Sequence, residues 1–542
     1  MKFISCSNVA NEHLKTFTTK TCSMNNIDHI VYLMMENRSL DSVLGWLYQK
    51  EKPKNFIPKK NTNPYNGLQT GNYSNPDGNG GLVPVTQITK AQGQTIPDID
   101  PNEDFEHVQL QIANGMQGFY TDFLTTGSTN PKEIMETFTP DSLPVINSLA
   151  RQFAVSDAYF SSIPTQTNCN RAFSLTGNSI GSYHYTGNLR TAMVDNYWEK
   201  GLTDAGDPYE FTEKSIWDVL NENNYSSNND WMVFYSQTWP GLTTYEGSYC
   251  FTQDLLWPTM KDQTSHFDDI TSFFTMAAAG NLPTFSFLEP MWYEEEHGIG
   301  HNGADYHPPG NVSCGEQFLY KIYEALKASP NWANTILIVN FDEHGGTYDH
   351  VTPPSTNIVA PWDNLSDGTA PPDDYDINFS YTRLGVRVPL ILASPLIDER
   401  TVFRSHTNIP FDHTSVIATI LNHFNIPKAD WGLGSRTANA PTFEKVITLS
   451  PAQARTNVAI KPPLSTSCVS DDPTAPPNDL QQMIMHRALR QAVRRNGYSK
   501  TRYNELYSEH LNGLTSIKQL TAGAGKILAT LAQEKEKMQN IQ

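Results

Sequence analysis

The sequence has no run of apolar residues long enough to cross a membrane, which takes roughly 18 uninterrupted apolar residues. Its first residues, "MKFISCSNVANEHLK", contain one early lysine and then turn polar, so they lack the apolar core of a secretory signal. We therefore expect a soluble protein. Export, if it occurs, would use a route that needs no cleaved N-terminal signal.

Positive charge is also scarce. The chain has 38 Lys and Arg residues against 57 Asp and Glu residues, which gives a formal net charge of −19. A general nucleic-acid binder shows a basic footprint, so this balance excludes that class of protein. An anionic substrate would have to be held by a local site, such as a bound cation.

Cysteine is sparse and scattered. The six cysteines form no CxxC pair and no framework of a small disulfide-stapled scaffold. Sulfur-rich metal ligation is therefore excluded. The sequence has no internal repeat, and nothing in it indicates an oligomeric state.

The chain does contain an alternation of apolar, strand-like runs with helical segments, and its 542 residues are enough to bury a large core. This alternation predicts an α/β fold with a doubly wound, mostly parallel sheet. We expect strands within residues 27–35, 154–160, 282–290, 335–341 and 386–397. We expect helices within residues 106–123, 316–328 and 413–424. A long surface excursion is expected at residues 50–103, and no elements are resolved within residues 185–280.

The composition changes at about residue 446, where a proline-rich connector begins. Helical patterns follow it at residues 479–496 and at roughly 514–538. We therefore predict a catalytic domain at residues 25–445 and a connector with a small helical C-terminal region at residues 446–542.

The first of these C-terminal helices is basic, with Arg487, Arg490, Arg494 and Arg495. It would either lie on an anionic membrane or dock on the acidic body of the protein, and its alanine-rich apolar side favours docking. We expect residues 446–542 to be dispensable for a soluble diester but to matter for membrane substrates or delivery. The polar tail "AQEKEKMQNIQ" resembles export signals read by specialised bacterial secretion systems.

The motif "TILIVNFDEHGGTYDH" at residues 335–350 draws attention because polar groups follow a strand-like apolar run. Charged side chains at the carboxyl end of a central strand lie where open α/β sheets bind ligands. The alternative is a strand that leads into an ordinary solvated turn. A second apolar run, at residues 27–35, likewise ends in polar groups, Glu36 and Asn37.

Together the two strand ends offer the oxygen atoms of Glu36, Asn37, Asp342 and Glu343, with several histidines in the loop near residue 300. Oxygen donors beside imidazole suit Zn, Mn, Mg or Ca. The block "PTQTNCNR" adds the hydroxyl of Thr167, which could attack phosphorus if a cation activated it. Taken alone, that hydroxyl is better explained by an ordinary turn or cap.

Five blocks are similar to those of a known family: "HIVYLMMENRS", "PTQTNCNR", "DYHPPGNVSCGE", "NFDEHGGTYDHV" and "DHTSV". Their order and spacing resemble those of the bacterial and plant phosphoesterase family that contains phosphatidylcholine-type phospholipases C and a respiratory-burst-inhibiting acid phosphatase. That family looks like a branch of the alkaline phosphatase superfamily. The resemblance runs from about residue 27 to residue 430 and implies a sheet of alkaline phosphatase type.

The resemblance implies roles for individual residues of this chain. It implies that Thr167 is a metal-bound nucleophile and that His307 faces the phosphoryl group. The implied metal ligands are Glu36, Asn37, Asp342, Glu343 and Thr167. His350 and Asp305 are candidates for supporting the metal or holding a second one, with His350 among the catalytic groups. The implied substrate-binding residues are Asn170, Arg171, Glu103 and His107.

The chain departs from the family pattern at several of these positions. Glu103 stands where many relatives place a histidine, so a proton donor or phosphate contact is lost or moved to His107. Asn168 and Cys169 replace the more usual His and Pro after the nucleophile, and Thr347 replaces an aromatic residue. These changes leave the implied metal ligands intact.

The resemblance therefore implies a metal-dependent phospholipase C that acts on phospholipid at a membrane surface. Its divalent metal is expected to be zinc, with calcium or manganese as alternatives. A broad-specificity acid phosphatase using the same site is the first alternative function. An inactive protein that binds phospholipid or phosphate is the second. Secretion as an effector and a role in virulence belong to the same expectation of action at host membranes.

Overall fold

The computed structural model describes residues 24–89, 95–183, 189–196, 210–235, 249–292, 303–362, 373–374, 379–465, 478–495, 500–511 and 513–539. Parts of the histidine-rich loop near residue 300 and of the proline-rich connector, and the whole N-terminal segment before Met24, lie outside these ranges. Within the ranges, no helix combines the length and the apolar character needed to cross a bilayer.

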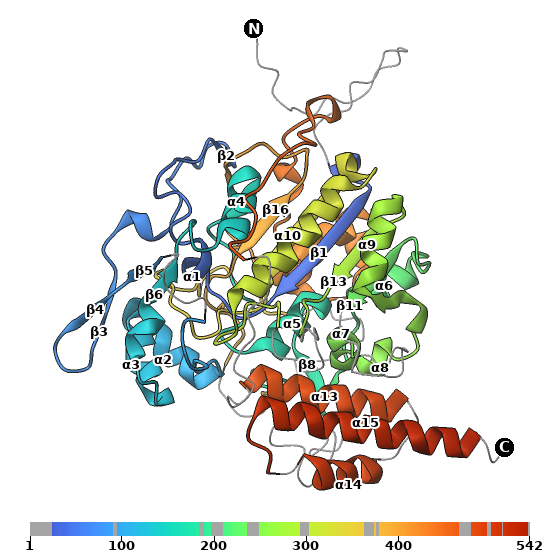
Figure 1. The fold of residues 1–542 in the computed structure, drawn as a ribbon. Coiled ribbons are helices and arrows are strands. Elements are labelled where there is room, and N and C mark those ends of the chain that lie inside the picture. The colour runs from blue at the N-terminus through green and yellow to red at the C-terminus, as the bar shows by residue number, and fades with distance from the viewer. Residues whose placement is uncertain are drawn as a thin grey trace, which may run out of the picture.

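A nine-stranded sheet forms the centre of the molecule (Figure 1). Every strand pair in it is parallel except the two pairs made by β16, which runs antiparallel to both of its neighbours. The prediction of a mostly parallel sheet is therefore confirmed. In spatial order the strands are β12 (Phe267–Asp269), β11 (Trp231–Tyr235), β13 (Phe285–Leu288), β1 (His29–Met35), β14 (Thr335–Phe341), β16 (Leu390–Ala393), β7 (Ala154–Ser156), β17 (Thr401–Phe403) and β2 (Asn55–Ile57).

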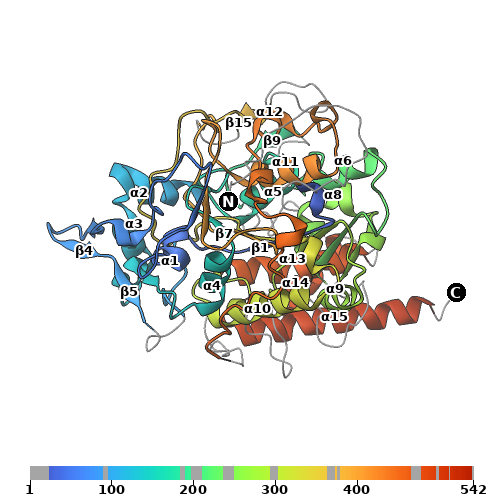
Figure 2. The ribbon, with the colours of Figure 1, turned by 90° about the horizontal axis from the view of Figure 1, so that it is seen from above.

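The central strands β1 and β14 are buried along almost their whole length. Both faces of such strands must be covered, which is why they read as continuous apolar runs. Helices cover both faces, as Figure 2 shows from above. On one face lie α4 (Pro144–Gln152), α9 (Ile270–Ala279) and α10 (Val312–Ala328). On the other lie α5 (Thr167–Thr176), α6 (Ile216–Glu222), α11 (His413–His423) and α12 (Gly434–Asn439).

Smaller elements surround this core. The remaining helices of the main body are α1 (Leu40–Leu44), α2 (Phe105–Met116), α3 (Phe119–Phe123), α7 (Phe251–Leu255) and α8 (Trp257–Met260). Short strands pair outside the main sheet: β3 (Ser74–Pro76) with β4 (Leu82–Pro84), β5 (Thr86–Ile88) with β6 (Glu136–Phe138), and β8 (Ile180–Tyr183), β9 (Leu189–Ala192), β10 (Glu210–Phe211) and β15 (Asp373–Asp374) in a four-stranded sheet.

The predicted helix at residues 106–123 is interrupted in the structure. The backbone of α2 leaves helical geometry at Ala113, Asn114 and Gly115, and α3 begins after Gly118. Asn114 and Gly115 both have positive φ, a conformation that these two residue types adopt more readily than most. The sequence pattern alone did not reveal this break.

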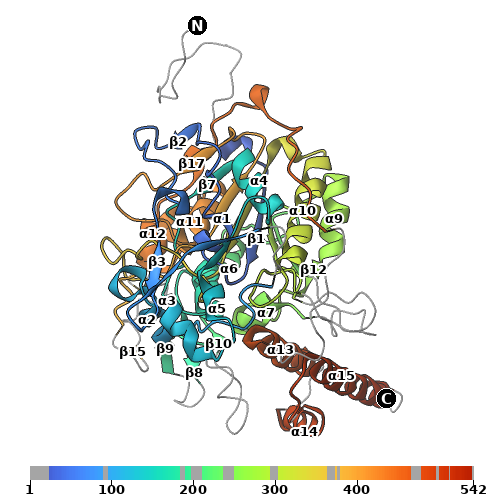
Figure 3. The same ribbon diagram turned by 60° about the vertical axis from the view of Figure 1, so that its left-hand side comes forward.

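The C-terminal region contains α13 (Asp479–Arg495), α14 (Lys500–His510) and α15 (Ile517–Gln539), of which α14 was not predicted. These helices form a group at the edge of the molecule, on the side of α5 and α7 (Figures 1 and 3). Met483, Ile484 and Leu489 of α13 are buried, and Arg487 and Arg490 form ion pairs with Asp254. Helix α13 therefore docks on the main body of the protein, which is the second of the two alternatives given above.

The connector shows no break in packing at the predicted boundary near residue 446. Val446, Ile447, Val458 and Ile460 are buried with the main core. The Tyr323 hydroxyl of α10 donates a hydrogen bond to the carbonyl of Val458. The first part of the connector is thus attached to the main body.

Candidate active site

The site begins at the carboxyl ends of β1 and β14. These strands are parallel neighbours, with Met35 opposite Phe341. Because the two ends are in register, Glu36 and Asp342 leave the sheet side by side. All of the side chains Glu36, Asn37, Asp342 and Glu343 are fully buried. The predicted meeting of the two strand ends is therefore present in the structure.

The glycine pair after Glu343 allows the turn to lie against Asn37. Gly345 has φ +56°, and a Cβ atom there would lie 2.3 Å from the carbonyl oxygen of Asn37. Asn37 itself has φ 51°, and its N–H donates a 3.0 Å hydrogen bond to Asp342 Oδ1. The close approach of the two backbones excludes any side chain at position 345, which explains why glycine follows the acidic pair.

Thr167 reaches the same place from α5. It is the first residue of that helix, and its Oγ1 lies 3.1 Å from Glu36 Oε2 and 3.3 Å from Asn37 Oδ1. The preceding residue, Gln166, makes no side-chain cap. The positive end of the helix dipole therefore lies at the site, where it favours an anionic group.

Arg171 lies one turn further along α5 and is buried with the acidic side chains. Its Nε donates to Glu36 Oε1 at 2.6 Å and lies 3.4 Å from Asp342 Oδ2, while its guanidinium contacts the rings of Phe251 and Trp292. Burial alone would lower the pKa of Arg171, but the charges of Glu36 and Asp342 raise it. Among the described residues, Arg171 therefore holds these two carboxylates in place.

The acidic side chains outnumber the positive charge of Arg171. Glu36, Asp342 and Glu343 are buried together, and Glu103 joins them through a 2.5 Å hydrogen bond from Asn37 Nδ2. Burial, and then the charge of Asp342, raise the pKa values of Glu36 and Glu343 well above the usual range. Clustered carboxylates in an apolar interior are costly unless a cation offsets them.

Two oxygen atoms of the cluster support the same conclusion. Asp342 Oδ2 and Glu343 Oε1 are buried and accept no hydrogen bond within the described residues. A divalent cation coordinated by carboxylate, amide and hydroxyl oxygens would use these lone pairs. The residues whose oxygen atoms could serve as its ligands are Glu36, Asn37, Asp342, Glu343 and Thr167, and their role as ligands stays a prediction.

His307 and Asp305 lie in the loop beside the cluster. Asp305 supports the loop, since its carbonyl accepts from the N–H of Glu36 at 2.8 Å and its Oδ1 accepts from the N–H of His307 at 2.8 Å. His307 Nε2 lies 3.8 Å from Glu103 Oε2. Burial lowers the pKa of His307 to about 3, so its imidazole is neutral at neutral pH.

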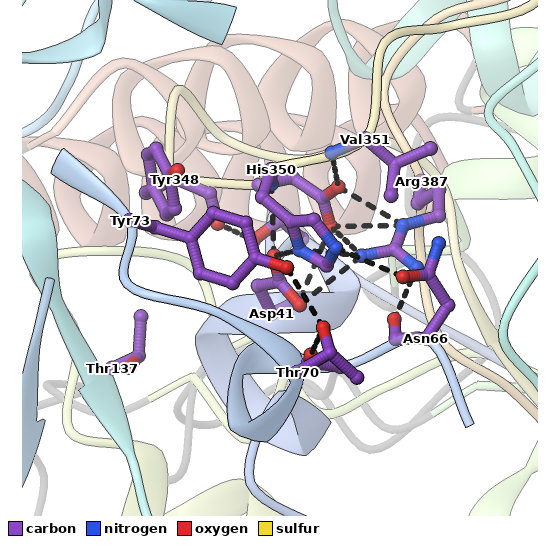
Figure 4. Close-up of polar contacts among 12 residues, drawn as sticks. Asp41, Asn66, Thr70, Tyr73, Thr137, Tyr348, His350, Val351 and Arg387 are labelled. Carbon is purple, nitrogen blue, oxygen red and sulfur yellow. Dashed lines mark hydrogen bonds and ion pairs between the residues drawn. The ribbon is translucent and has the colours of Figure 1, made fainter. Parts of the chain in front are cut away.

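His350 is placed in a different group of side chains, shown in Figure 4. Its Nδ1 lies 2.5 Å from Asp41 Oδ2 and its Nε2 lies 3.1 Å from Asn66 Oδ1, with the ring of Tyr73 packed over it. Arg387 pairs with Asp41 and Asp349 in the same group. His350 therefore has a structural network around it, and the structure does not join it to Thr167.

The predicted substrate-binding residues also have other partners. Asn170 holds the turn before α5: its Oδ1 accepts from the N–H of Ile163, and its Nδ2 donates to the carbonyl of Thr165. His107 is half-buried on α2, and its Nδ1 lies 2.6 Å from Asp122 Oδ1. Of the four predicted substrate-binding residues, Glu103 and Arg171 have described contacts with the acidic cluster.

Sequence reasoning missed two neighbours of the site. Asp100 lies 3.8 Å from His307 Nδ1, and its place just before Glu103 in "DIDPNE" could have suggested it. Arg487 of α13 donates from Nη1 to Asn168 Oδ1 at 3.0 Å, beside the proposed nucleophile. No local sequence signal announces the second contact, since the two residues are distant in the chain.

An acidic, hydroxyl-bearing site at the carboxyl edge of a mostly parallel sheet is an arrangement typical of α/β enzymes. Residues 27–427 match the model of the Phosphoesterase family. Because this match covers most of the chain, the protein belongs to the Phosphoesterase family.

Similar proteins include plant and bacterial phospholipases C. The chain is 32% identical over 437 residues to Non-specific phospholipase C6 of Arabidopsis thaliana, which covers 78% of this chain and 72% of the plant protein. It is 26% identical over 436 residues to Phospholipase C A of Mycobacterium tuberculosis, with 74% of each chain covered. A solved protein of the alkaline phosphatase superfamily from Vibrio parahaemolyticus matches at 13% identity over 68% of this chain and 82% of that chain, with a TM-score of 0.29, which is too low to inform the site.

Proposed function

We propose that this protein is a metal-dependent phospholipase C that hydrolyses glycerophospholipids to diacylglycerol and a phosphorylated headgroup. The observation that carries the proposal is the position of Thr167 Oγ1, 3.1 Å from Glu36 Oε2 and 3.3 Å from Asn37 Oδ1. A hydroxyl that lies within hydrogen-bonding distance of the ligand atoms of a cation site is well placed to become a nucleophile. The names of the plant and mycobacterial relatives support phospholipid as the substrate.

The cation would be held by Glu36, Asn37, Asp342, Glu343 and Thr167. When bound, it would lower the pKa of the hydroxyl and offset negative charge on the phosphoryl oxygens. We propose zinc, with calcium or manganese as alternatives, because the donors are oxygen atoms with an imidazole nearby.

Thr167 Oγ1 would form the bond to phosphorus while the bond from phosphorus to the glycerol oxygen breaks. Thr167 Oγ1 can donate to Glu36 Oε2 at 3.1 Å or to Asn37 Oδ1 at 3.3 Å, and the carboxylate of Glu36 would accept the proton. Water would then hydrolyse the phosphothreonine and restore Thr167. The N-terminus of α5 favours the negative charge carried through both steps.

The leaving diacylglycerol oxygen needs a proton. The resemblance implies that His307 faces the phosphoryl group, but the lowered pKa of that residue, about 3, leaves its imidazole neutral at neutral pH. We therefore propose that solvent supplies the proton and that His307 contributes a neutral imidazole beside the reacting group.

Product analysis on mixed phospholipids, combined with metal analysis of the purified protein, tests this function. We expect diacylglycerol and phosphorylated headgroup from the wild type, and a loss of at least a thousandfold in kcat for Thr167→Ala. Thr165→Ala is the matched control, since that nearby hydroxyl binds Asp195 instead of the cluster. It should keep most of the activity.

Three outcomes would contradict the proposal. Activity of Thr167→Ala within tenfold of the wild type would remove Thr167 as the nucleophile. Faster turnover of a small aryl phosphate than of any lipid diester would assign an acid phosphatase. Phospholipid binding without turnover would assign a binding protein.

A further inference from the structure

A second group of metal-ligating side chains lies beside the cluster that contains Thr167. It consists of Asp100, Glu103 and His307, whose potential ligand atoms all lie within 4.8 Å of one another. Glu103 and His307 are buried, with 6% and 2% of their surfaces exposed, and the side chain of Asp100 is 19% exposed. The group therefore has one partly open side.

The backbone fixes the tautomer of His307. Its Nδ1 lies 2.5 Å from the carbonyl oxygen of Pro308, an atom that can only accept, so Nδ1 carries the proton and donates. Nε2 is then left with a lone pair. A histidine that binds a metal commonly donates its other ring N–H to a backbone carbonyl in this way.

That lone pair has no hydrogen-bond donor. His307 Nε2 is buried and has no hydrogen-bond partner within the part of the chain that the structure describes. Its nearest acidic atom, Glu103 Oε2 at 3.8 Å, is also an acceptor when ionised. Two acceptor atoms at this separation can share a positively charged species.

Two nitrogen atoms of the nearby guanidinium of Arg38 have partners elsewhere, and the third, Nη2, has no hydrogen-bond partner among the described residues. Its Nε donates to the carbonyl of Tyr306 and its Nη1 to the carbonyl of Ile96, each at 2.8 Å. Arg38 thus fastens the two loops that carry His307 and Asp100. It leaves the lone pair of His307 Nε2 unsatisfied.

We propose that Asp100, Glu103 and His307 bind a second divalent cation, next to the one assigned to Glu36, Asn37, Asp342 and Glu343. Two carboxylates and one imidazole suit zinc or manganese. Glu103 connects the two sites, since its Oε2 also accepts from Asn37 Nδ2 at 2.5 Å. Binding of this cation is independent of the reaction, whereas its role rests on the proposed function: it would offset charge on the phosphoryl group.

Zinc titration of the full-length, metal-free protein tests the proposal by its stoichiometry. We expect two equivalents for the wild type and one for Asp100→Asn, with at least tenfold weaker binding of the second equivalent in Glu103→Gln. Glu106→Gln is the matched control, because Glu106 is an exposed carboxylate on the same segment and should keep both equivalents. Circular dichroism should show that all variants are folded.

The variant Asp342→Asn separates this site from the first one. It should keep one equivalent of zinc, and adding Asp100→Asn should remove it. In a zinc-soaked crystal, anomalous scattering should place an ion roughly 2.0–2.1 Å from His307 Nε2. Wild-type stoichiometry and affinity in both Asp100→Asn and Glu103→Gln would overturn the proposal, whereas loss of activity in Asp342→Asn alone would concern only the first site.

Discussion

Gly345 shows how one residue fixes the geometry of the site. We predict that Gly345→Ala removes most activity and weakens zinc binding at least tenfold, because the new Cβ would meet the carbonyl of Asn37 at 2.3 Å in a backbone with φ +56°. Steady-state kinetics and zinc titration measure the two effects.

Gly127→Ala is the control for backbone strain. Gly127 also has positive φ, +81°, but a Cβ there would meet no atom within 4 Å. This substitution should lower the free energy of unfolding only by the strain of a left-handed residue, about 1–2 kcal/mol, and activity should be retained. Equal loss of activity in both variants would show that strain, and not the contact with Asn37, causes the effect.

At the residue scale, the sequence located the acidic cluster but not its surroundings. The sequence pattern could identify Glu36, Asn37, Asp342 and Glu343 because each pair directly follows a buried apolar strand. His350 shows the limit of this reasoning. It follows the same motif by only a few residues, yet the turn through Gly345 and Gly346 carries it to Asp41. The direction of the chain after a turn with two positive φ angles cannot be predicted from the local sequence pattern.

Among the elements, α13 links the C-terminal region to the first turn of α5, which carries Thr167. Arg487 donates both to Asn168 Oδ1 and to Asp254 Oδ2, and its guanidinium lies over the ring of Phe251. We predict that Arg487→Ala lowers kcat severalfold on a soluble diester, because the first turn of α5 loses a support beside Thr167.

Arg490→Ala is the comparison for that prediction. Arg490 pairs with the same carboxylate, Asp254, but has no described contact with Asn168. It should lower the melting temperature with little change in kcat. If the two variants reduce kcat alike, α13 acts through general stability. The contact also argues against our expectation that residues 446–542 are dispensable for soluble substrates, an expectation that truncation would test.

Helix α10 connects the loop of His307 to α4 through Glu316. The carboxyl group of Glu316 accepts from the N–H groups of Val145 and Ile146 and from the hydroxyl of Tyr306. Burial nevertheless raises its pKa from 4.5 to about 7. The folded protein therefore binds a proton at this position that the unfolded chain releases near its ordinary pKa.

A pH dependence of stability follows from this shift. A raised pKa in the folded state means that the contribution is fully present below about pH 4.5 and is lost as the pH rises through about 7. We predict that Glu316→Gln, which resembles the protonated form, flattens the fall in stability between pH 5 and 8. Unfolding by denaturant at several pH values, at one fixed metal concentration, measures this, and an unchanged slope would contradict it.

For the whole molecule, a cation bound by the buried carboxylates would make stability depend on metal content. We predict that chelation lowers the melting temperature of the wild type, because a ligand that binds only the folded state stabilises it. Asp342→Asn should respond less to zinc and, without metal, should be at least as stable as the wild type, since one of the crowded charges is removed. Differential scanning calorimetry of both proteins measures this. An identical zinc response would contradict the assigned ligands.

The sequence also predicted the overall architecture better than its details. Strands β1 and β14 and helices α10 and α11 were visible because long apolar or amphipathic patterns mark them. The antiparallel direction of β16 could not be predicted, because an apolar run that is buried on both faces has the same pattern in either direction. β11 was missed because it lies in an aromatic, asparagine-rich stretch. Export by a specialised secretion system and action at host membranes stay predictions.

The reversed direction of β16 has a consequence for how such a protein can diversify. Leu390 of β16 pairs with Asn340 of β14, so the connection at residues 342–389 leaves and re-enters the sheet at the same edge as Thr167. Its length can therefore change without carrying the chain past the sheet. Insertions and deletions after Val351 in this connection would leave the strands and the acidic pair Asp342 and Glu343 in place, which gives evolution, or an engineer, a route to new substrate preferences.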